Sequence, residues 1–129
     1  MPFETRDSGE REEFPTGSRR DTQTGKPRYD LIGHEGLTRL AGLMERGAAK
    51  YGPSNWRLGQ PVSRYYASAF RHLIQWASGN RDEDHLSGVV FNIFGIMHIE
   101  DTLSKTRPEL LDHESYNIAK EAADVDPAD

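Results

Sequence analysis

Residues 71–92 read RHLIQWASGNRDEDHLSGVVFN, and this stretch holds the densest group of chemically versatile side chains in the protein. It has the pattern of the end of one amphipathic helix, a short polar turn and the start of a second helix. Such a hairpin brings His72, Asp84, His85 and Asn92 close together, and side chains of these kinds bind metals or transfer protons. The stretch therefore predicts a helical protein with its site at this turn.

The apolar residues on either side of the turn predict an all-α fold with helices near 35–50, 63–78 and 83–105. Ser63 is the expected N-cap of the second helix. The first helix carries an apolar stripe made of Leu37, Leu40, Ala41, Met44 and Ala48. The expected buried face of the second helix is made of Tyr66, Ala69, Phe70, Leu73, Trp76 and Ala77.

The helix predicted over residues 83–105 is apolar around most of its circumference. Such a helix needs packing partners on more than one side, and in so small a protein the second partner is another subunit. We therefore expect a homo-oligomer that associates through this helix. His85 and Asn92 lie two turns apart on one face of it, where polar groups are unfavourable unless a partner satisfies them.

The two ends of the 129-residue chain are poor in large apolar side chains, whereas residues 37–103 hold most of them. We expect a flexible arm over residues 1–24, a helical domain over 25–105 and an acidic tail over 106–129. Candidate docking contacts in the tail are Leu110, Leu111, Tyr116 and Ile118.

The composition excludes several classes of partner. The net charge of −5 argues against DNA or RNA, because phosphate neutralisation along a nucleic acid needs a clustered positive surface. A free nucleotide needs only a few local cations. There is no cysteine, which excludes disulfides and thiolate metal sites. The N-terminus has no apolar signal core and residues 89–99 are too short to span a bilayer, so we expect a cytoplasmic protein with no membrane partner.

Residues 51–59 read YGPSNWRLG, a loop that combines aromatic rings with an amide and a cation. Tyr51 and Trp56 could stack on a nucleotide base, and Asn55 could read the base edge. Equally, Trp56 could plug the end of a helical bundle. Both interpretations stay open at the level of sequence.

A stiff segment precedes the first helix, where residues 25–32 read GKPRYDLI. Its proline disfavours helix in the residue before it and holds the segment extended. Arg28 is therefore either part of a phosphate clamp or part of a packed lead-in to the core.

Residues 20–32 read RDTQTGKPRYDLI, and shorter blocks follow: RGAAKYG at 46–52, NW at 55–56, SRY at 63–65, SAFRHL at 68–73 and DEDHL at 82–86. In order and spacing these blocks resemble the N-terminal domain of phage dATP/dGTP diphosphohydrolases. The resemblance covers residues 20 to about 104, and the combination of blocks is more specific than any one of them.

The resemblance implies a phage protein related to the MazG-like pyrophosphohydrolases, which are oligomeric all-α helical bundles. Those enzymes use a divalent metal to hydrolyse nucleoside triphosphates between the α- and β-phosphates. By position, the nucleotide pocket would include Lys50, Tyr51, Asn55 and Trp56. The catalytic region would include Arg71, His72, Asp84, His85 and Asn92.

The first hypothesis is a metal-dependent hydrolase that converts dATP or dGTP to the monophosphate and pyrophosphate. The candidate catalytic residues and metal ligands are His72, Asp84 and His85. Their imidazoles make a transition metal such as cobalt or manganese the first expectation, with magnesium as the alternative. The cations expected to offset phosphate charge are Lys50, Arg71 and Arg28.

Two other functions fit the same residues. A pocket without turnover could sequester a nucleotide, such as a cyclic-nucleotide or ADP-ribose-type immune signal in antiphage defence. Alternatively, the residues could only complete a helical bundle. Turnover of a nucleotide would support hydrolysis over both alternatives. A ligand retained without turnover would support sequestration over a purely structural role.

Overall fold

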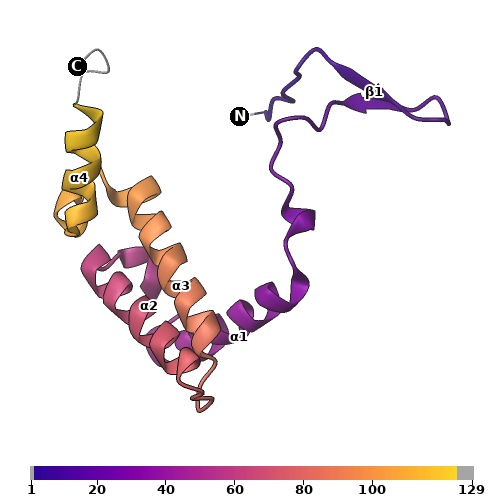
Figure 1. Ribbon diagram of the computed structural model, residues 1–129. Coiled ribbons are helices and arrows are strands. Elements are labelled where there is room, and N and C mark those ends of the chain that lie inside the picture. Colours follow the sequence, from indigo (N-terminus) through magenta and orange to yellow (C-terminus); the bar gives the residue numbers. More distant parts are fainter. Residues whose placement is uncertain (1, 125–129) are drawn as a thin grey trace. The chain divides into compact units, whose positions relative to one another are not determined.

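The computed structural model describes residues 2–124 and divides into two compact units, one ending at Ile32 and the other beginning at Gly33 (Figure 1). The helices of the second unit are α1 (His34–Tyr51), α2 (Val62–Ala77), α3 (His85–His98) and α4 (Glu114–Ala123). Short 3₁₀ turns cover Tyr29–Leu31, Asn55–Leu58 and Pro108–Leu110, and a π-helical turn, Ile99–Leu103, follows α3 directly.

The predicted all-α fold is confirmed. The helices predicted over 35–50 and 63–78 lie within one residue of α1 and α2 at each end. The helix predicted over 83–105 is α-helical only from His85 to His98, after which the π turn continues to Leu103. Within residues 2–124, no helix combines the length and the apolar character of a membrane span.

The first unit contains an antiparallel hairpin of β1 (Arg11–Glu13) and β2 (Arg19–Asp21). Every cross-strand pair sets opposite charges against each other: Arg11 with Asp21, Glu12 with Arg20 and Glu13 with Arg19. Such pairs stabilise neighbouring strands. The hairpin lies inside the arm predicted over residues 1–24, where the apolar alternation that usually indicates a strand is absent.

The second unit is organised by the packing of α2 on α3, which lie side by side and run antiparallel (Figure 1). Apart from Ser87, the buried positions of α3 and its continuation recur at intervals of three and four residues: His85, Gly88, Asn92, Gly95 and Ile99. A Cβ atom at Gly95 would lie 2.5 Å from the ring of Tyr65, and one at Gly88 would lie 2.9 Å from the ring of His72. The glycines therefore let two ring side chains of α2 lie directly against the backbone of α3.

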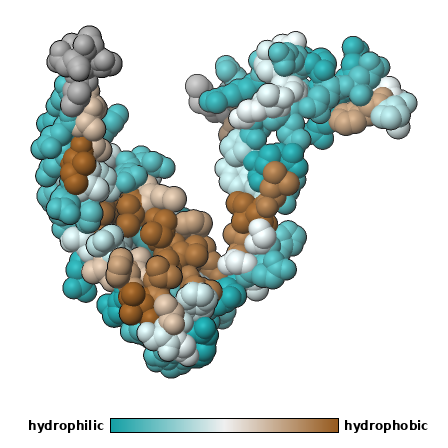
Figure 2. Space-filling model, in the orientation of Figure 1, coloured by the Kyte–Doolittle hydropathy of each residue, from teal (hydrophilic) through white to brown (hydrophobic). Residues whose placement is uncertain are grey.

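This packing corrects the predicted buried face of α2. Tyr66, Phe70 and Leu73 are 47%, 54% and 43% exposed, whereas α2 buries Val62, Tyr65 and Ala69. The exposed apolar residues of α3 are Val90, Ile93, Phe94 and Met97. Figure 2 shows apolar side chains gathered over this pair of helices. The reason is that small and polar residues form the interhelical contact, so the large apolar residues of both helices point away from it.

The apolar core lies where α2 begins and α3 ends. Its buried members are Val62, Tyr65, Ile99 and Leu110, and Leu111 and Tyr116 pack against them. Three of the four docking contacts expected in the acidic tail are therefore made, whereas Ile118 is 59% exposed. The predicted tail, residues 106–129, contains α4, and its last five residues lie outside the described part of the chain.

The first turn of α2 is capped by Asp112, which lies 49 positions after Ser63 in the sequence. The backbone N–H and the hydroxyl of Ser63 donate to the carboxylate of Asp112, at 2.8 and 2.6 Å. Ser63 lies within the first turn, after the N-cap position of Pro61, so its prediction as the N-cap was wrong. An acceptor brought by tertiary packing satisfies the N–H group that a local cap would have satisfied.

Gly95→Ala should lower the free energy of unfolding by about 1–3 kcal/mol, because its methyl group would overlap the Tyr65 ring. Urea denaturation followed by circular dichroism measures the change. Gly36→Ala in α1 is the matched control, since a Cβ there meets nothing within 4 Å, and it should be neutral or stabilising by up to about 1 kcal/mol. Equal stability of Gly95→Ala and the wild type would contradict the close packing.

Candidate functional site

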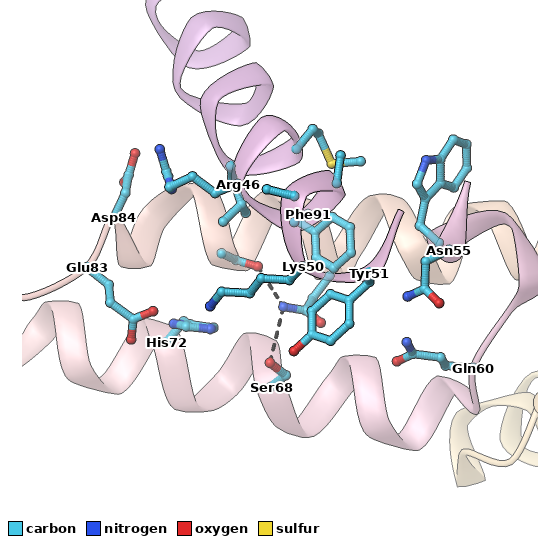
Figure 3. Close-up of a pocket in the computed structure, with 18 of the residues that line it drawn as sticks. Arg46, Lys50, Tyr51, Asn55, Gln60, Ser68, His72, Glu83, Asp84 and Phe91 are labelled. Carbon is cyan, nitrogen blue, oxygen red and sulfur yellow. Dashed lines mark hydrogen bonds between the residues drawn. The ribbon is translucent and has the colours of Figure 1, made fainter. Parts of the chain in front are cut away.

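An open pocket of about 1290 Å³ lies in the second unit. Its walls are the second half of α1, the loop that follows, the middle of α2, the turn at residues 81–84 and the inner face of α3 (Figure 3). Small-molecule sites commonly measure roughly 300–1,000 Å³, so the pocket has room for a ligand of nucleotide size.

Cations outnumber carboxylates in the pocket lining, although the whole chain carries a net charge of −5. The carboxylates are Asp82, Glu83 and Asp84, and the cations are Arg39, Arg46, Lys50, Arg64, Arg71 and Arg81. Among the described residues, no ion pair engages Arg46, Lys50, Arg64 or Arg71. The pocket therefore suits a ligand with several negative charges.

The lining is also divided chemically along its length, as Figure 3 shows. His72 and Glu83 lie toward one end, and Asn55 and Gln60 lie toward the other. Lys50 and Tyr51 lie between these two groups. One end thus offers an imidazole and a carboxylate, and the other offers amide groups next to an aromatic ring.

The hairpin of α2 and α3 brings His72 and His85 into direct contact. Their Nδ1 atoms lie 2.9 Å apart, and the Nε2 atom of His85 lies 2.7 Å from a carboxylate oxygen of Asp82. The side chain of His85 has no exposed surface, whereas His72 lines the pocket. Burial lowers the pKa of His72, and the nearby Arg71 cation lowers it further.

Asp84 is the N-cap of α3. Its carboxylate accepts from the backbone N–H of Ser87 at 3.3 Å, as an N-cap does, and from Nε of Arg39 at 2.9 Å. The bond from Arg39 holds the pKa of Asp84 well below its usual range. The predicted ligand Asp84 therefore lines the pocket with its carboxylate already engaged by Arg39.

Asn92 and Arg71 both reach the hydroxyl of Ser68 on α2. The amide of Asn92 donates to the carbonyl of Gly88 at 2.7 Å and to Ser68 Oγ at 3.3 Å. Arg71 donates to the same hydroxyl at 3.3 Å. The buried amide of Asn92 is thus satisfied within the α2–α3 contact, at the inner wall of the pocket.

The loop residues of the predicted nucleotide pocket differ in how tightly the fold holds them. Tyr51 is 70% exposed, whereas Trp56 is half-buried. The ring of Trp56 meets the ring of His98 edge-on, with centroids 5.0 Å apart, and the guanidinium of Arg57 lies 4.6 Å from its centre. Trp56 therefore has the fold contacts expected of a plug, and it also lines the pocket.

Arg28, the remaining predicted phosphate contact, lies in the first unit. Its guanidinium donates to both carboxylate oxygens of Asp30, at 2.8 and 2.7 Å. The hydrogen bonds from Arg28 lower the pKa of Asp30.

Asp82, Glu83 and His85 form a group whose ligand atoms lie within 4.8 Å of one another. Both ring nitrogens of His85 already have partners, so the exposed carboxylates of Asp82 and Glu83 are the donors open to a cation. Carboxylate oxygens suit manganese and magnesium. The donor set therefore fits a divalent metal, held by carboxylates that were not among the predicted ligands His72, Asp84 and His85.

Several residues of this site were not predicted from the sequence. Gly88 and Asp82 determine the position of the histidine pair, and Gln60, Arg46 and Arg64 line the pocket. The repeat of Gly88 and Gly95 at heptad spacing was a detectable signal, because small residues at such intervals permit close helix packing.

The family model of the dATP/dGTP diphosphohydrolase N-terminal domain matches residues 16–109 of this chain. The protein belongs to this family. The match covers every residue of the pocket lining, and it ends before Asp112 and α4. No curated protein and no solved structure matches the chain. The dATP/dGTP diphosphohydrolase resemblance inferred from the sequence blocks is therefore confirmed.

Asp84→Ala should lower the free energy of unfolding by about 1 kcal/mol, the usual effect of losing an N-cap. Asp84→Asn keeps a good cap but loses the charge that pairs with Arg39, so its effect should be smaller. The folded state holds the pKa of Asp84 below its unfolded value. The stabilising charge is therefore complete at neutral pH and is lost as the pH falls through the lowered pKa.

Urea denaturation across a pH series measures this effect. The stability difference between wild type and Asp84→Asn should shrink in acid, and Arg39→Gln should reproduce it at neutral pH. A pH-independent difference would contradict a structural role for this ion pair.

Proposed function

We propose that this protein is a metal-dependent diphosphohydrolase that converts dATP or dGTP to the monophosphate and pyrophosphate. The observation that carries the proposal is the charge of the pocket: a chain with net charge −5 concentrates cations around one cavity. The family supports a hydrolase of this class. The division of the pocket into a charged end and an amide-bearing end supports a nucleotide ligand.

The cations of the pocket lining suit the triphosphate. Arg46, Lys50, Arg64 and Arg71 line the pocket without ion pairs in the described part of the chain, so their charge is available to phosphate oxygens. Charge builds up on the leaving pyrophosphate as the bond to the α-phosphorus breaks. Cations near that position stabilise the developing charge and so lower the barrier.

The amide-bearing end suits the base. Tyr51 offers an exposed ring for stacking, and Asn55 and Gln60 offer amide groups that both donate and accept hydrogen bonds. Adenine and guanine differ in the pattern of donors and acceptors along their edges. Amides can rotate to match either pattern, which fits a site that takes both purines.

Asp82 and Glu83 would hold the divalent metal, with manganese or magnesium as the best match to carboxylate donors. When bound, the metal would supply Lewis-acid polarisation of the phosphoryl oxygens. In the reaction, the oxygen of water bonds to the α-phosphorus, the bond to the bridging oxygen breaks, and pyrophosphate leaves. The water also loses a proton, for which His72 lies at the same end of the pocket.

Purified protein incubated with a panel of nucleotides and with magnesium, manganese or cobalt should release monophosphate and pyrophosphate from dATP and dGTP. In isotopically labelled water, the label should enter the monophosphate, because attack occurs at the α-phosphorus. Lys50→Ala should lower kcat/KM by about ten- to a hundredfold, which corresponds to the ~1.5–3 kcal/mol of a charged hydrogen bond. Chromatography of the products measures each outcome.

Lys105→Ala removes an exposed cation that does not line the pocket and should leave kcat/KM unchanged. The absence of product with every nucleotide and metal would sink the hydrolase proposal.

Sequestration of a nucleotide without turnover is the second candidate function. The observation that favours it is the engagement of Asp84 by Arg39, which leaves the pocket richer in binding cations than in available carboxylates. A ligand that stays bound through purification and is released by heat, together with no turnover, would support this function over hydrolysis.

We also propose that two copies associate through the exposed apolar face of α2 and α3. Phe70 and Ile74 on α2 and Phe94 and Met97 on α3 are each more than half exposed in the single chain. Large apolar side chains gathered on one face mark an interaction surface. A second copy of the same helical pair would complete a four-helix bundle, whose core these residues would fill.

Sedimentation velocity should show a dimer or larger oligomer at micromolar concentration. Phe94→Glu should shift the protein to a monomer, because it places a charge in the apolar contact. The control is Ile118→Glu, which changes an exposed apolar residue of α4 outside this face and should leave the oligomer intact. A monomeric wild type would contradict the proposal.

A further inference from the structure

Asp82, His85 and His72 form a continuous chain of hydrogen bonds from the turn to the pocket. The Asp82 carboxylate lies 2.7 Å from Nε2 of His85, and Nδ1 of His85 lies 2.9 Å from Nδ1 of His72. The middle member has no exposed side-chain surface. Water therefore cannot replace either of the partners of His85.

The chemistry of the three groups determines which atom donates and which accepts in each of these hydrogen bonds. An ionised carboxylate only accepts, so Nε2 of His85 must carry the proton it donates to Asp82. A neutral imidazole has one N–H and one lone pair, which leaves Nδ1 of His85 as an acceptor. Nδ1 of His72 must then carry a proton, and its Nε2 is left with a lone pair.

The geometry also determines where that lone pair lies. Nδ1 of His72 lies toward α3, because it contacts Nδ1 of His85 at 2.9 Å, and a Cβ at Gly88 would lie 2.9–3.1 Å from Cδ2, Cγ and Nδ1 of the same ring. His72 nevertheless lines the pocket, so Nε2 is the nitrogen left to face it. Because Gly88 leaves no spare room behind the ring, the imidazole cannot retreat from the pocket wall.

We infer that Asp82 and His85 are positioning residues that fix the tautomer of His72 and present its Nε2 lone pair to the pocket as the proton acceptor for the attacking water. This inference rests on the proposed function. The oxygen of water bonds to the α-phosphorus, its proton moves to Nε2 of His72, and pyrophosphate leaves. The positive charge gained by His72 is shared through Nδ1 with His85, which faces the Asp82 carboxylate.

A metal held between the two Nδ1 atoms is the competing explanation of their short separation. It is disfavoured because the described residues offer no third donor grouped with both histidines. The buried position of His85 also leaves no room for the water ligands that a two-nitrogen site would need.

The test is long-range proton–nitrogen correlation NMR on metal-free protein with isotope-labelled histidine, which identifies the protonated nitrogen of each ring. At neutral pH, His72 should be protonated at Nδ1 and His85 at Nε2. Asp82→Leu removes the acceptor and should abolish the single tautomer of His72. Asp82→Asn keeps a carbonyl acceptor and should retain it, and Glu83→Gln, which removes a neighbouring charge, should leave both tautomers unchanged.

The side chain of Asp82 is 62% exposed, so these variants should fold as the wild type does. In turnover assays Asp82→Leu should lower kcat by roughly tenfold or more, part of the usual contribution of a general base, with little change in KM. Because Asp82 is also a proposed metal ligand, the assay is run at saturating metal, where Asp82→Asn, whose carbonyl oxygen can accept from His85, should restore most of the loss.

Protonation of His72 at Nε2 in the wild type would overturn the inference, whatever the activity. Displacement of the Nδ1 proton of His72 by added zinc, which is diamagnetic, would overturn it in favour of a metal between the rings. The expected tautomers with no turnover of any nucleotide would overturn the base role and the proposed hydrolysis together, while the tautomer assignment would stand.

Discussion

The close approach of α2 and α3 across Gly88 and Gly95 is the constraint on which the second unit depends. Tyr65 and His72 lie one heptad apart on α2 and meet Gly95 and Gly88 on α3, so both rings pack directly on the backbone of α3. Any larger residue at either glycine would separate the helices. The core at one end of the contact and the histidine pair at the other would then lose their geometry together.

Small and polar residues make up much of the contact between α2 and α3, and this has two consequences. Several large apolar side chains of both helices are left exposed outside the contact, and a further protein surface could cover them: Phe70, Ile74, Phe94 and Met97. In exchange, the interior of the contact holds polar groups in defined partnerships: Asn92 bonds to the carbonyl of Gly88, and His85 bonds to both His72 and Asp82. These satisfied groups favour one geometry, because a shift would leave one of them unpaired, whereas the hydroxyl of Tyr65 is buried in the same contact without a hydrogen-bond partner among the described residues.

Different elements supply the charged groups of the pocket beside this contact. Lys50 and Arg46 come from α1, Arg64 and Arg71 come from α2, and the carboxylates come from the turn before α3. The rigid helical pair fixes the imidazole, and the cations surround it on long side chains that can adapt to a phosphate. In the proposed reaction, the cations would bind the charged ligand next to a proton acceptor that the helical pair holds in place.

The sequence by itself determined the all-α fold, the bounds of α1 and α2, and the meeting of His72 with His85, because each follows from local periodicity and a short turn. It could not indicate which face of α2 is buried, because apolar periodicity marks a face to be covered without saying by what. Only the tertiary structure paired Asp84 with Arg39, brought Asp112 to the start of α2 and joined Asp82 to the buried histidine. The first two contacts join residues 45 and 49 positions apart, and all three depend on where the packed helices place the side chains.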